Sequence, residues 1–277
     1  MTEAIKMLTL INIIFIILLA VSGMVQGIGG EIIYYLAFIV PIGIGFYTSR
    51  GLQYKREEVK GLAEPDETLL SLDLQRSKRL LPLIFPAVMT VFLSSLVTSL
   101  LLSLVGVSAP PVEEKGIVTM LIIHALIPAF LEEALFRYIP MKLLLPYSRR
   151  WCVIYSALCF ALIHCSFYQM PYAFVAGLIF MTVDVAFESV WPSVILHFIN
   201  NSASVVWIKY CSSMTESVIF ISSLAVLSLV SAIFIFRKRD EYRATFRGSF
   251  DKGESSEITY APFLLAFITC YLAFSNL

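Results

Sequence analysis

The chain has 277 residues, of which 58% are hydrophobic and only 14% are charged, and its mean hydropathy is +0.84. This composition excludes an ordinary soluble domain and predicts an all-α, polytopic integral membrane protein. The 20 basic and 20 acidic residues cancel, so no overall charge indicates nucleic acid as a partner. The lipid bilayer is the first partner that the sequence predicts.

Roughly nine apolar segments approach or exceed the length that crosses about 30 Å of hydrocarbon as a helix. We therefore predict a transmembrane helix bundle of eight or nine spans, the last segment being short for a span. Three regions are expected: N-terminal helices over 1–116, a core over 117–210, and C-terminal helices over 211–277. The segments cover approximately residues 5–24, 31–48, 80–107, 117–144, 151–168, 171–190, 193–210, 216–236 and 260–275.

Basic residues gather in two polar stretches, a linker over 49–79 and a loop over 237–258. Cytoplasmic loops carry an excess of Lys and Arg, so we predict that both stretches face the cytoplasm. Strict alternation then places the N-terminus inside and the poorly basic connections 25–30 and 109–116 outside. The linker also carries leucines between residues 69 and 74, which suggest a short interfacial helix. We interpret the first segment as a retained helix rather than a cleaved signal peptide, because its apolar run exceeds a typical signal sequence.

The fourth segment contains ionisable residues that a helix facing lipid should lack, namely Glu132, Glu133 and Arg137. One ionised side chain near the bilayer centre costs about 2.5 to 3.5 kcal/mol on insertion scales, so this group predicts a functional site inside the membrane. On an ideal helix Glu133 lies about 40° from Arg137 and Glu132 about 140° from it. We expect Glu133 to pair with Arg137 and Glu132 to face water.

Two further segments repeat the spacing of four residues, which places both members of a pair on one helical face. Phe160 and His164 lie on the fifth segment, and His197 and Asn201 lie on the seventh. The order Glu-Glu-x-x-x-Arg, Phe-x-x-x-His, His-x-x-x-Asn resembles the motifs of the CPBP or Abi family of intramembrane proteases. That family includes CAAX prenyl proteases and bacteriocin-processing proteins, and the resemblance covers roughly residues 117–205.

Hydrolysis of a peptide bond needs an activated water, a donor to the oxyanion and a proton for the leaving amine. Glu132 is the best candidate base, and His164 would share the water with it. His197 and Asn201, one turn apart, are suited to donate hydrogen bonds to the oxyanion, and Phe160 is expected to form a packing wall. The family resemblance implies the same assignments.

Zinc or another divalent metal is one option for this site, because Glu132, His164 and His197 would make a set of two histidines and one glutamate. Against it, the chain has no His-Glu-x-x-His helix, and the three ligands come from separate segments. The family resemblance leaves both a metalloprotease and a metal-free glutamate mechanism open.

These features predict an intramembrane endopeptidase acting on membrane-associated peptides or proteins, and the resemblance implies CAAX-like or bacteriocin- and pheromone-type substrates. His197 lies near the predicted cytoplasmic end of its helix and Glu132 near the middle of a long span, so we expect an active-site cavity open toward the cytoplasm. The family resemblance implies a conical cavity, and we expect the protein in a bacterial plasma membrane. The alternatives are an ion- or proton-coupled transporter, in which the same residues form a relay, and a non-catalytic bacteriocin-immunity protein.

Three ionisable residues in apolar segments belong to no motif. His124 is interpreted as a polar side chain whose hydrogen bonds are satisfied. Asp184 and Glu188 are four residues apart, either at the entrance of the cavity or at the cytoplasmic edge. We leave all three out of the predicted catalytic set.

Overall fold

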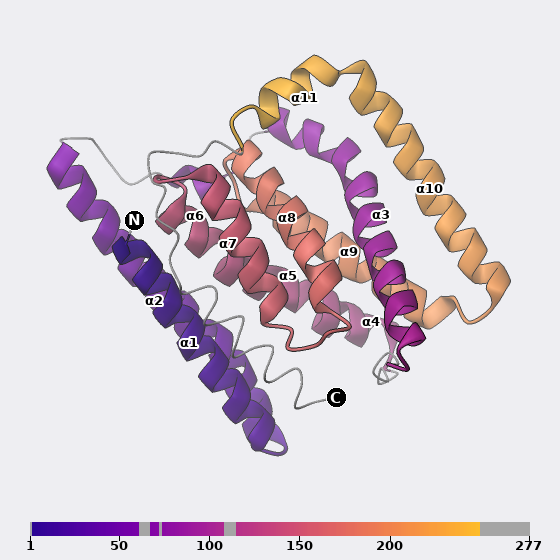
Figure 1. The fold of residues 1–277 in the computed structure, drawn as a ribbon, viewed down its shortest axis with the longest axis horizontal. Helices are drawn as coiled ribbons and strands as arrows, with labels where there is room; N and C mark the ends of the chain where they lie inside the picture. The colour runs from indigo at the N-terminus through magenta and orange to yellow at the C-terminus, as the bar shows by residue number, and fades with distance from the viewer. Residues whose placement is uncertain (1, 61–66, 72–73, 108–114, 250–277) are drawn as a thin grey trace.

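The computed structural model describes residues 2–60, 67–71, 74–107 and 115–249, and this part of the chain is all-helical, as predicted (Figure 1). The helices are α1 (Thr2–Met24), α2 (Ile28–Lys60), α3 (Leu74–Leu104), α4 (Ile117–Met120), α5 (Ile127–Glu133), α6 (Ile139–Leu144), α7 (Arg149–Leu162), α8 (Met170–Phe187), α9 (Trp191–Tyr210), α10 (Met214–Arg237) and α11 (Arg239–Phe246). A short 3₁₀ helix covers Glu67–Leu70.

Six helices in the described residues are long and apolar enough to cross a membrane. Two expected spans are not among them. The one expected over 151–168 is the shorter helix α7, whose 14 residues rise only about 21 Å and do not cover the hydrocarbon core. The other is α9, which has 20 residues but carries the polar His197, Asn200 and Asn201 near its centre. The segment expected at 260–275 lies outside the described residues. The six spans are Glu3–Met24, Ile28–Leu52, Arg76–Leu104, Ile117–Leu144, Met170–Phe187 and Met214–Arg237.

The motif-bearing helices lie in the middle of the bundle. Figure 1 shows α1 and α2 as an antiparallel hairpin along one side of the molecule and α10 along the other. Between them α7 packs along α8, α3 packs against α8 and α10, and α5 packs against α9. A buried polar contact fastens the hairpin to this core, since Asn12 Nδ2 donates to the Tyr155 hydroxyl at 3.0 Å.

The outward face of α10 is apolar and exposed. Val218, Ile219, Val226, Leu229 and Val230 are each between 55% and 62% exposed. A contiguous apolar surface of this kind marks contact with a partner or a membrane, and a helix satisfies its own backbone polar groups in lipid. The exposed face of α10 therefore supports an integral membrane protein.

The segment expected as one helix over 117–144 is helical throughout, but its hydrogen-bond register changes twice. Two π-helical turns interrupt it, at Leu121–Leu126 and Ala134–Tyr138. Isolated π-helical turns inside α-helices occur frequently at functional sites. Glu132 and Glu133 lie on α5, between the two turns.

A proline follows each π-helical turn and frees a backbone carbonyl. Pro128 and Pro140 have no N–H to donate, so the carbonyls four residues earlier lose their α-helical donor. These are the carbonyls of His124 and Phe136. The hydroxyl of Ser156, on α7, donates to the Phe136 oxygen. A side chain of α9 donates to the His124 oxygen.

The linker expected over 49–79 is more helical than predicted. Helix α2 continues through its polar end to Lys60, and the 3₁₀ helix Glu67–Leu70 agrees with the expected short helix. The oxygen of Leu69 accepts a hydrogen bond from Val190 N at 3.0 Å. The linker is thus tied to the start of α9.

The basic stretch expected as a loop over 237–258 contains helix α11 in its first part. The Tyr242 hydroxyl of α11 donates to the carbonyl oxygen of Arg79 at 3.1 Å. Arg79 in turn donates from Nη1 to Thr245 Oγ1 at 3.2 Å. These two contacts hold α11 against the start of α3, and residues 250–258 lie outside the described part.

Candidate active site

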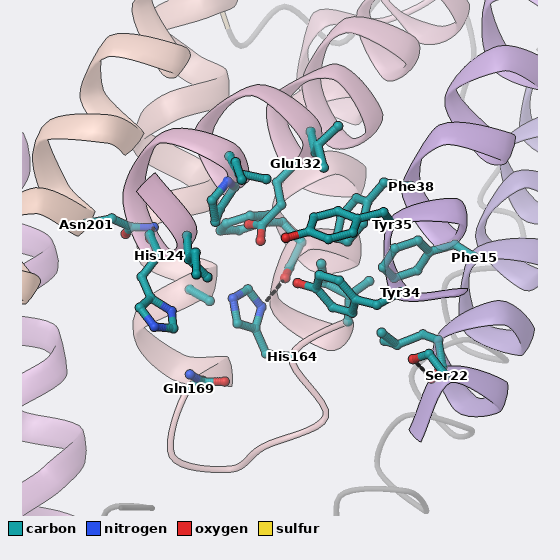
Figure 2. A pocket seen from close by; sticks show the side chains of 18 of the residues that line it. Phe15, Ser22, Tyr34, Tyr35, Phe38, His124, Glu132, His164, Gln169 and Asn201 are labelled. Atoms are coloured by element: carbon teal, nitrogen blue, oxygen red, sulfur yellow. Dashed lines mark hydrogen bonds between the residues drawn. The ribbon is translucent and has the colours of Figure 1, made fainter. Parts of the chain in front are cut away.

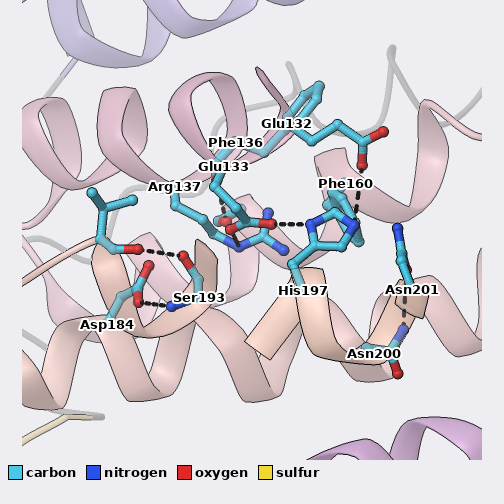
Figure 3. Close-up of polar contacts among 12 residues, drawn as sticks. Glu132, Glu133, Phe136, Arg137, Phe160, Asp184, Ser193, His197, Asn200 and Asn201 are labelled. Atoms are coloured by element: carbon cyan, nitrogen blue, oxygen red, sulfur yellow. Dashed lines mark hydrogen bonds and ion pairs between the residues drawn. The ribbon is translucent and has the colours of Figure 1, made fainter. Parts of the chain in front are cut away.

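A buried polar cluster lies at the centre of the bundle, where α5, the following π-helical turn and α9 meet (Figure 3). Arg137 Nε lies 3.2 Å from Glu133 Oε2, and both side chains are 0% exposed. Glu133 Oε1 lies 2.6 Å from His197 Nδ1. The Arg137 guanidinium stands 4.3 Å from the ring centroid of Phe160, within cation–π range. The predicted pairing of Glu133 with Arg137 is confirmed. We call Glu133, Arg137 and Phe160 the buried floor.

A pocket of about 980 Å³ lies against this floor (Figure 2), which is the size of a typical ligand pocket. Glu132, His164, His197 and Asn201 all line it, whereas Glu133 does not. The Glu132 side chain is 14% exposed, and its Oε2 lies 3.8 Å from His197 Nε2. The two neighbouring carboxylates therefore point into different surroundings.

His164 lies in the turn after α7 and not inside a helix as expected, because α7 ends at Leu162. Its Nδ1 lies 2.8 Å from the backbone oxygen of Phe160. A carbonyl can only accept a hydrogen bond, so Nδ1 carries the hydrogen and Nε2 of the neutral ring is a free acceptor. The side chain thus presents an unprotonated nitrogen to the pocket.

Asn201 supplies the hydrogen bond that the His124 carbonyl lacks because Pro128 has no N–H to donate. Its Nδ2 donates to the backbone oxygen of His124 at 3.0 Å, and its Oδ1 accepts from Asn200 Nδ2 at 3.2 Å. One hydrogen of the Asn201 amide remains for a ligand. His124 is exposed and lines the pocket, and its interpretation as a polar side chain whose hydrogen bonds are satisfied stays a prediction.

Asp184 and Glu188 lie away from the pocket. Asp184 is 0% exposed, and its Oδ1 accepts a hydrogen bond from the backbone N–H of Ser193 at 2.8 Å (Figure 3). It therefore caps the first turn of α9, where a carboxylate is favourable. Glu188 lies 3.4 Å from Arg76 and 3.3 Å from Arg149. It joins the ends of α3, α7 and α8, and neither acid lines a cavity entrance.

The α1–α2 hairpin supplies the pocket wall near Glu132, which sequence reasoning missed. Phe15, Tyr34, Tyr35 and Phe38 line the pocket from this side (Figure 2). The adjacent tyrosines within an apolar span were the one signal in the sequence. Nothing in their spacing indicated that the first two helices approach the motif helices.

The fit of a metal ion can be judged from the positions of its expected ligands. Across the described ranges, no three His, Cys, Asp or Glu side chains gather closely enough to hold a metal ion. His197 contacts Glu133 through Nδ1, which leaves Nε2 as the nitrogen that could face a metal. Glu132, His164 and His197 therefore do not form a ready three-ligand site.

The direction in which the pocket opens conflicts with one expectation. Its lining reaches Val25 and Gly27 in the α1–α2 turn, Lys115 before α4, and Gln169 before α8. The predicted topology places the connection 25–30 outside. An inside N-terminus and a cavity open toward the cytoplasm therefore exclude each other.

The comparisons with known proteins concern the part of the chain that builds this site. Residues 114–203 match the family described as Rce1-like, type II CAAX prenyl endopeptidase Rce1-like. The matched segment contains all three motifs and confirms the resemblance to the CPBP family over that segment. It covers less than half of the chain and supports a CAAX-type intramembrane endopeptidase family. No curated protein and no solved structure matches the chain.

Proposed function

We propose that this protein is an intramembrane endopeptidase that hydrolyses peptide bonds of membrane-associated substrates. One observation carries the proposal. Glu132, His164, His197 and Asn201, from three segments distant in sequence, line one pocket inside an apolar bundle. Ionisable groups at that depth are costly and commonly functional. The Rce1-like segment adds a family of endopeptidases to this geometry.

Glu132 is the general base in the proposed reaction. Its carboxylate removes a proton from a water in the pocket while the water oxygen attacks the carbonyl carbon of the scissile peptide bond. The Nε2 atom of His164 accepts a hydrogen bond from the same water and holds it in line. Glu133 cannot take this part, because it is enclosed by Arg137 and His197.

The tetrahedral oxyanion is stabilised by donors on α9. Asn201 has one free amide hydrogen, and His197 donates from Nε2 when its ring is doubly protonated. The carbon–nitrogen bond then breaks, and the proton held by Glu132 passes to the leaving amine. The products are one carboxylic acid and one amine, so atoms and charges balance without a further reactant.

The test uses the full chain reconstituted in lipid with a library of quenched fluorescent peptides carrying a lipid or helical anchor. We expect Glu132→Gln to lower kcat by about 100- to 10,000-fold, the usual contribution of a general base. Glu241→Gln is the matched control, because Glu241 is an exposed carboxylate on α11 that pairs with Lys238. Cleavage that survives Glu132→Gln at the rate of the control would reject the proposal.

Treatment with a chelator distinguishes a metalloprotease mechanism from a metal-free glutamate mechanism, both of which the family resemblance leaves open. The absence of a ready three-ligand set predicts that cleavage persists after prolonged dialysis against a chelator. Loss of activity on dialysis, restored by zinc or another divalent ion, would instead show that ligands move together when the metal binds. Both outcomes leave Glu132 testable by the same substitution.

A further inference from the structure

The pocket reaches one end of the bundle only. Its outer lining includes Ser22, Val25 and Glu31 of the α1–α2 hairpin and Gln169 before α8, and Val25 is 38% exposed. The α1–α2 turn and the connection between α7 and α8 both lie at the end of the molecule opposite α11 (Figure 1). Solvent and substrate therefore have a route to Glu132 from that end.

The opposite end of the pocket is closed by the buried floor. Glu133 and Arg137 are 0% exposed, Phe160 is 3% exposed, and Phe180 beside them is 1% exposed. Beyond the floor, Asp184 fastens the first turn of α9. Glu188 and its ion-pair partners, Arg76 and Arg149, do not line the pocket. A substrate cannot reach Glu132 through this packed layer.

The two ends differ sharply in basic residues. At the α11 end, Arg76 and Arg149 flank Glu188, while Arg79 and Lys238 lie against α11. At the pocket end, Lys115 and Lys209 are the only lysines or arginines in the described residues 22–31, 105–107, 115–117, 163–170 and 208–216. An excess of Lys and Arg marks the cytoplasmic side of a membrane protein. The α11 end is therefore cytoplasmic.

We infer that the pocket opens on the side of the membrane opposite the cytoplasm, and that its substrate is a membrane-anchored peptide presented at that outer face. The substrate part of this inference rests on the proposed endopeptidase function. A cytoplasmic lipidated C-terminus would meet the closed end. A segment leaving the outer leaflet would instead pass the aromatic wall of Tyr34 and Tyr35 on its way to Glu132.

The orientation is tested by cysteine labelling of the full chain in intact cells. Cys165, Cys211 and Cys270 are replaced by serine, while Cys152 and Cys159 stay because they are buried. Single cysteines are then placed at Gln26, in the α1–α2 turn, and at Arg150, at the α11 end, both of which are exposed.

We expect a membrane-impermeant maleimide to label Gln26→Cys in intact cells and to label Arg150→Cys only after the cells are permeabilised. The reverse pattern would overturn the inferred orientation whatever the activity of the protein. Labelling of both positions in intact cells would overturn it as well, since it would show that the two ends are not separated by a membrane. This result does not depend on cleavage, so it is independent of the proposed function.

The substrate side is tested with proteoliposomes that contain the protein in one known orientation. The probe is a synthetic transmembrane helix followed by a quenched fluorescent segment, which projects on either the Gln26 side or the Arg150 side. We expect cleavage on the Gln26 side alone. Cleavage only on the Arg150 side would overturn the inference and leave the endopeptidase function standing. Cleavage on neither side would reject both statements about activity but not the labelling result.

Discussion

Glu132 and Glu133 are neighbours in sequence, yet they belong to two different regions of the molecule. Glu132 lines the open pocket, while Glu133 is 0% exposed and enclosed between Arg137 and His197. A rotation of about 100° per residue on a helix is enough to send adjacent side chains to different faces. The pocket thus holds the carboxylate that can meet water, and the floor holds the one that cannot.

The two regions are coupled through His197. Its Nδ1 is bonded to the floor, and its Nε2 faces Glu132 at 3.8 Å. Buried ion pairs contribute little net stability compared with apolar packing, but breaking one by removal of a single partner is costly. We propose that the contact of Glu133 with Nδ1 holds the His197 ring in one orientation, and substitutions can separate this positioning from the chemistry of the pocket.

The largest effect on stability is expected from Arg137→Met, which leaves the Glu133 carboxylate buried without its cation. Breaking a buried pair in this way costs about 3 to 5 kcal/mol. The double variant Glu133→Gln with Arg137→Met removes both charges and keeps an acceptor for His197 Nδ1. We expect it to be less destabilised than Arg137→Met alone, as measured by thermal unfolding in detergent.

Additive losses of stability in the single and double variants would contradict the interpretation that Glu133 and Arg137 interact. If the double variant loses as much stability as the two single variants together, Glu133 and Arg137 do not interact energetically. Arg137 would then stabilise the bundle through its contact with the Phe160 ring, 4.3 Å away. Arg137→Lys, which keeps the charge and loses the planar guanidinium, distinguishes these two contributions.

A smaller effect is expected from Ser156→Ala, which takes the donor from the carbonyl that Pro140 leaves free. An unsatisfied buried acceptor costs about 1 to 3 kcal/mol. Ser202→Ala is the matched control, because the buried hydroxyl of Ser202 has no hydrogen-bond partner within the described part of the chain. Equal unfolding temperatures for the two variants would show that Ser156 does not support the Phe136 carbonyl.

The motif residues were predictable from sequence because their chemistry conflicts with their surroundings. Charged side chains in an apolar segment indicated Glu132, and imidazoles in pairs spaced by four residues indicated His164 and His197. The separation of Glu132 from Glu133 followed from helix geometry alone. The end of α7 before His164 was not predictable, because a short apolar run does not reveal where a helix stops inside a bundle.

The remaining errors concern contacts between distant segments. The α1–α2 wall depends on packing that no local pattern encodes, although Tyr34 and Tyr35 were visible in the sequence. The prolines at 128 and 140 were visible too, but only the tertiary partners on α9 and α7 show how the freed carbonyls are satisfied. The expected direction of the cavity was based on depth along one helix, without the position of its neighbours, and it is incompatible with the expected inside N-terminus.

The smallest effect is expected from Asp184, which acts on the pocket through α9. Loss of a capping acceptor in Asp184→Ala costs about 0.5 to 2 kcal/mol. Asp184→Asn keeps an oxygen for the Ser193 N–H and so keeps the capping contact. Ser193 is one turn before His197, so movement of this turn displaces the ring from Glu132 and lowers kcat while KM changes little. A positioning role requires that Asp184→Asn restores most of the kcat lost in Asp184→Ala. Equal loss in both variants would show that the capping oxygen does not hold α9 in place.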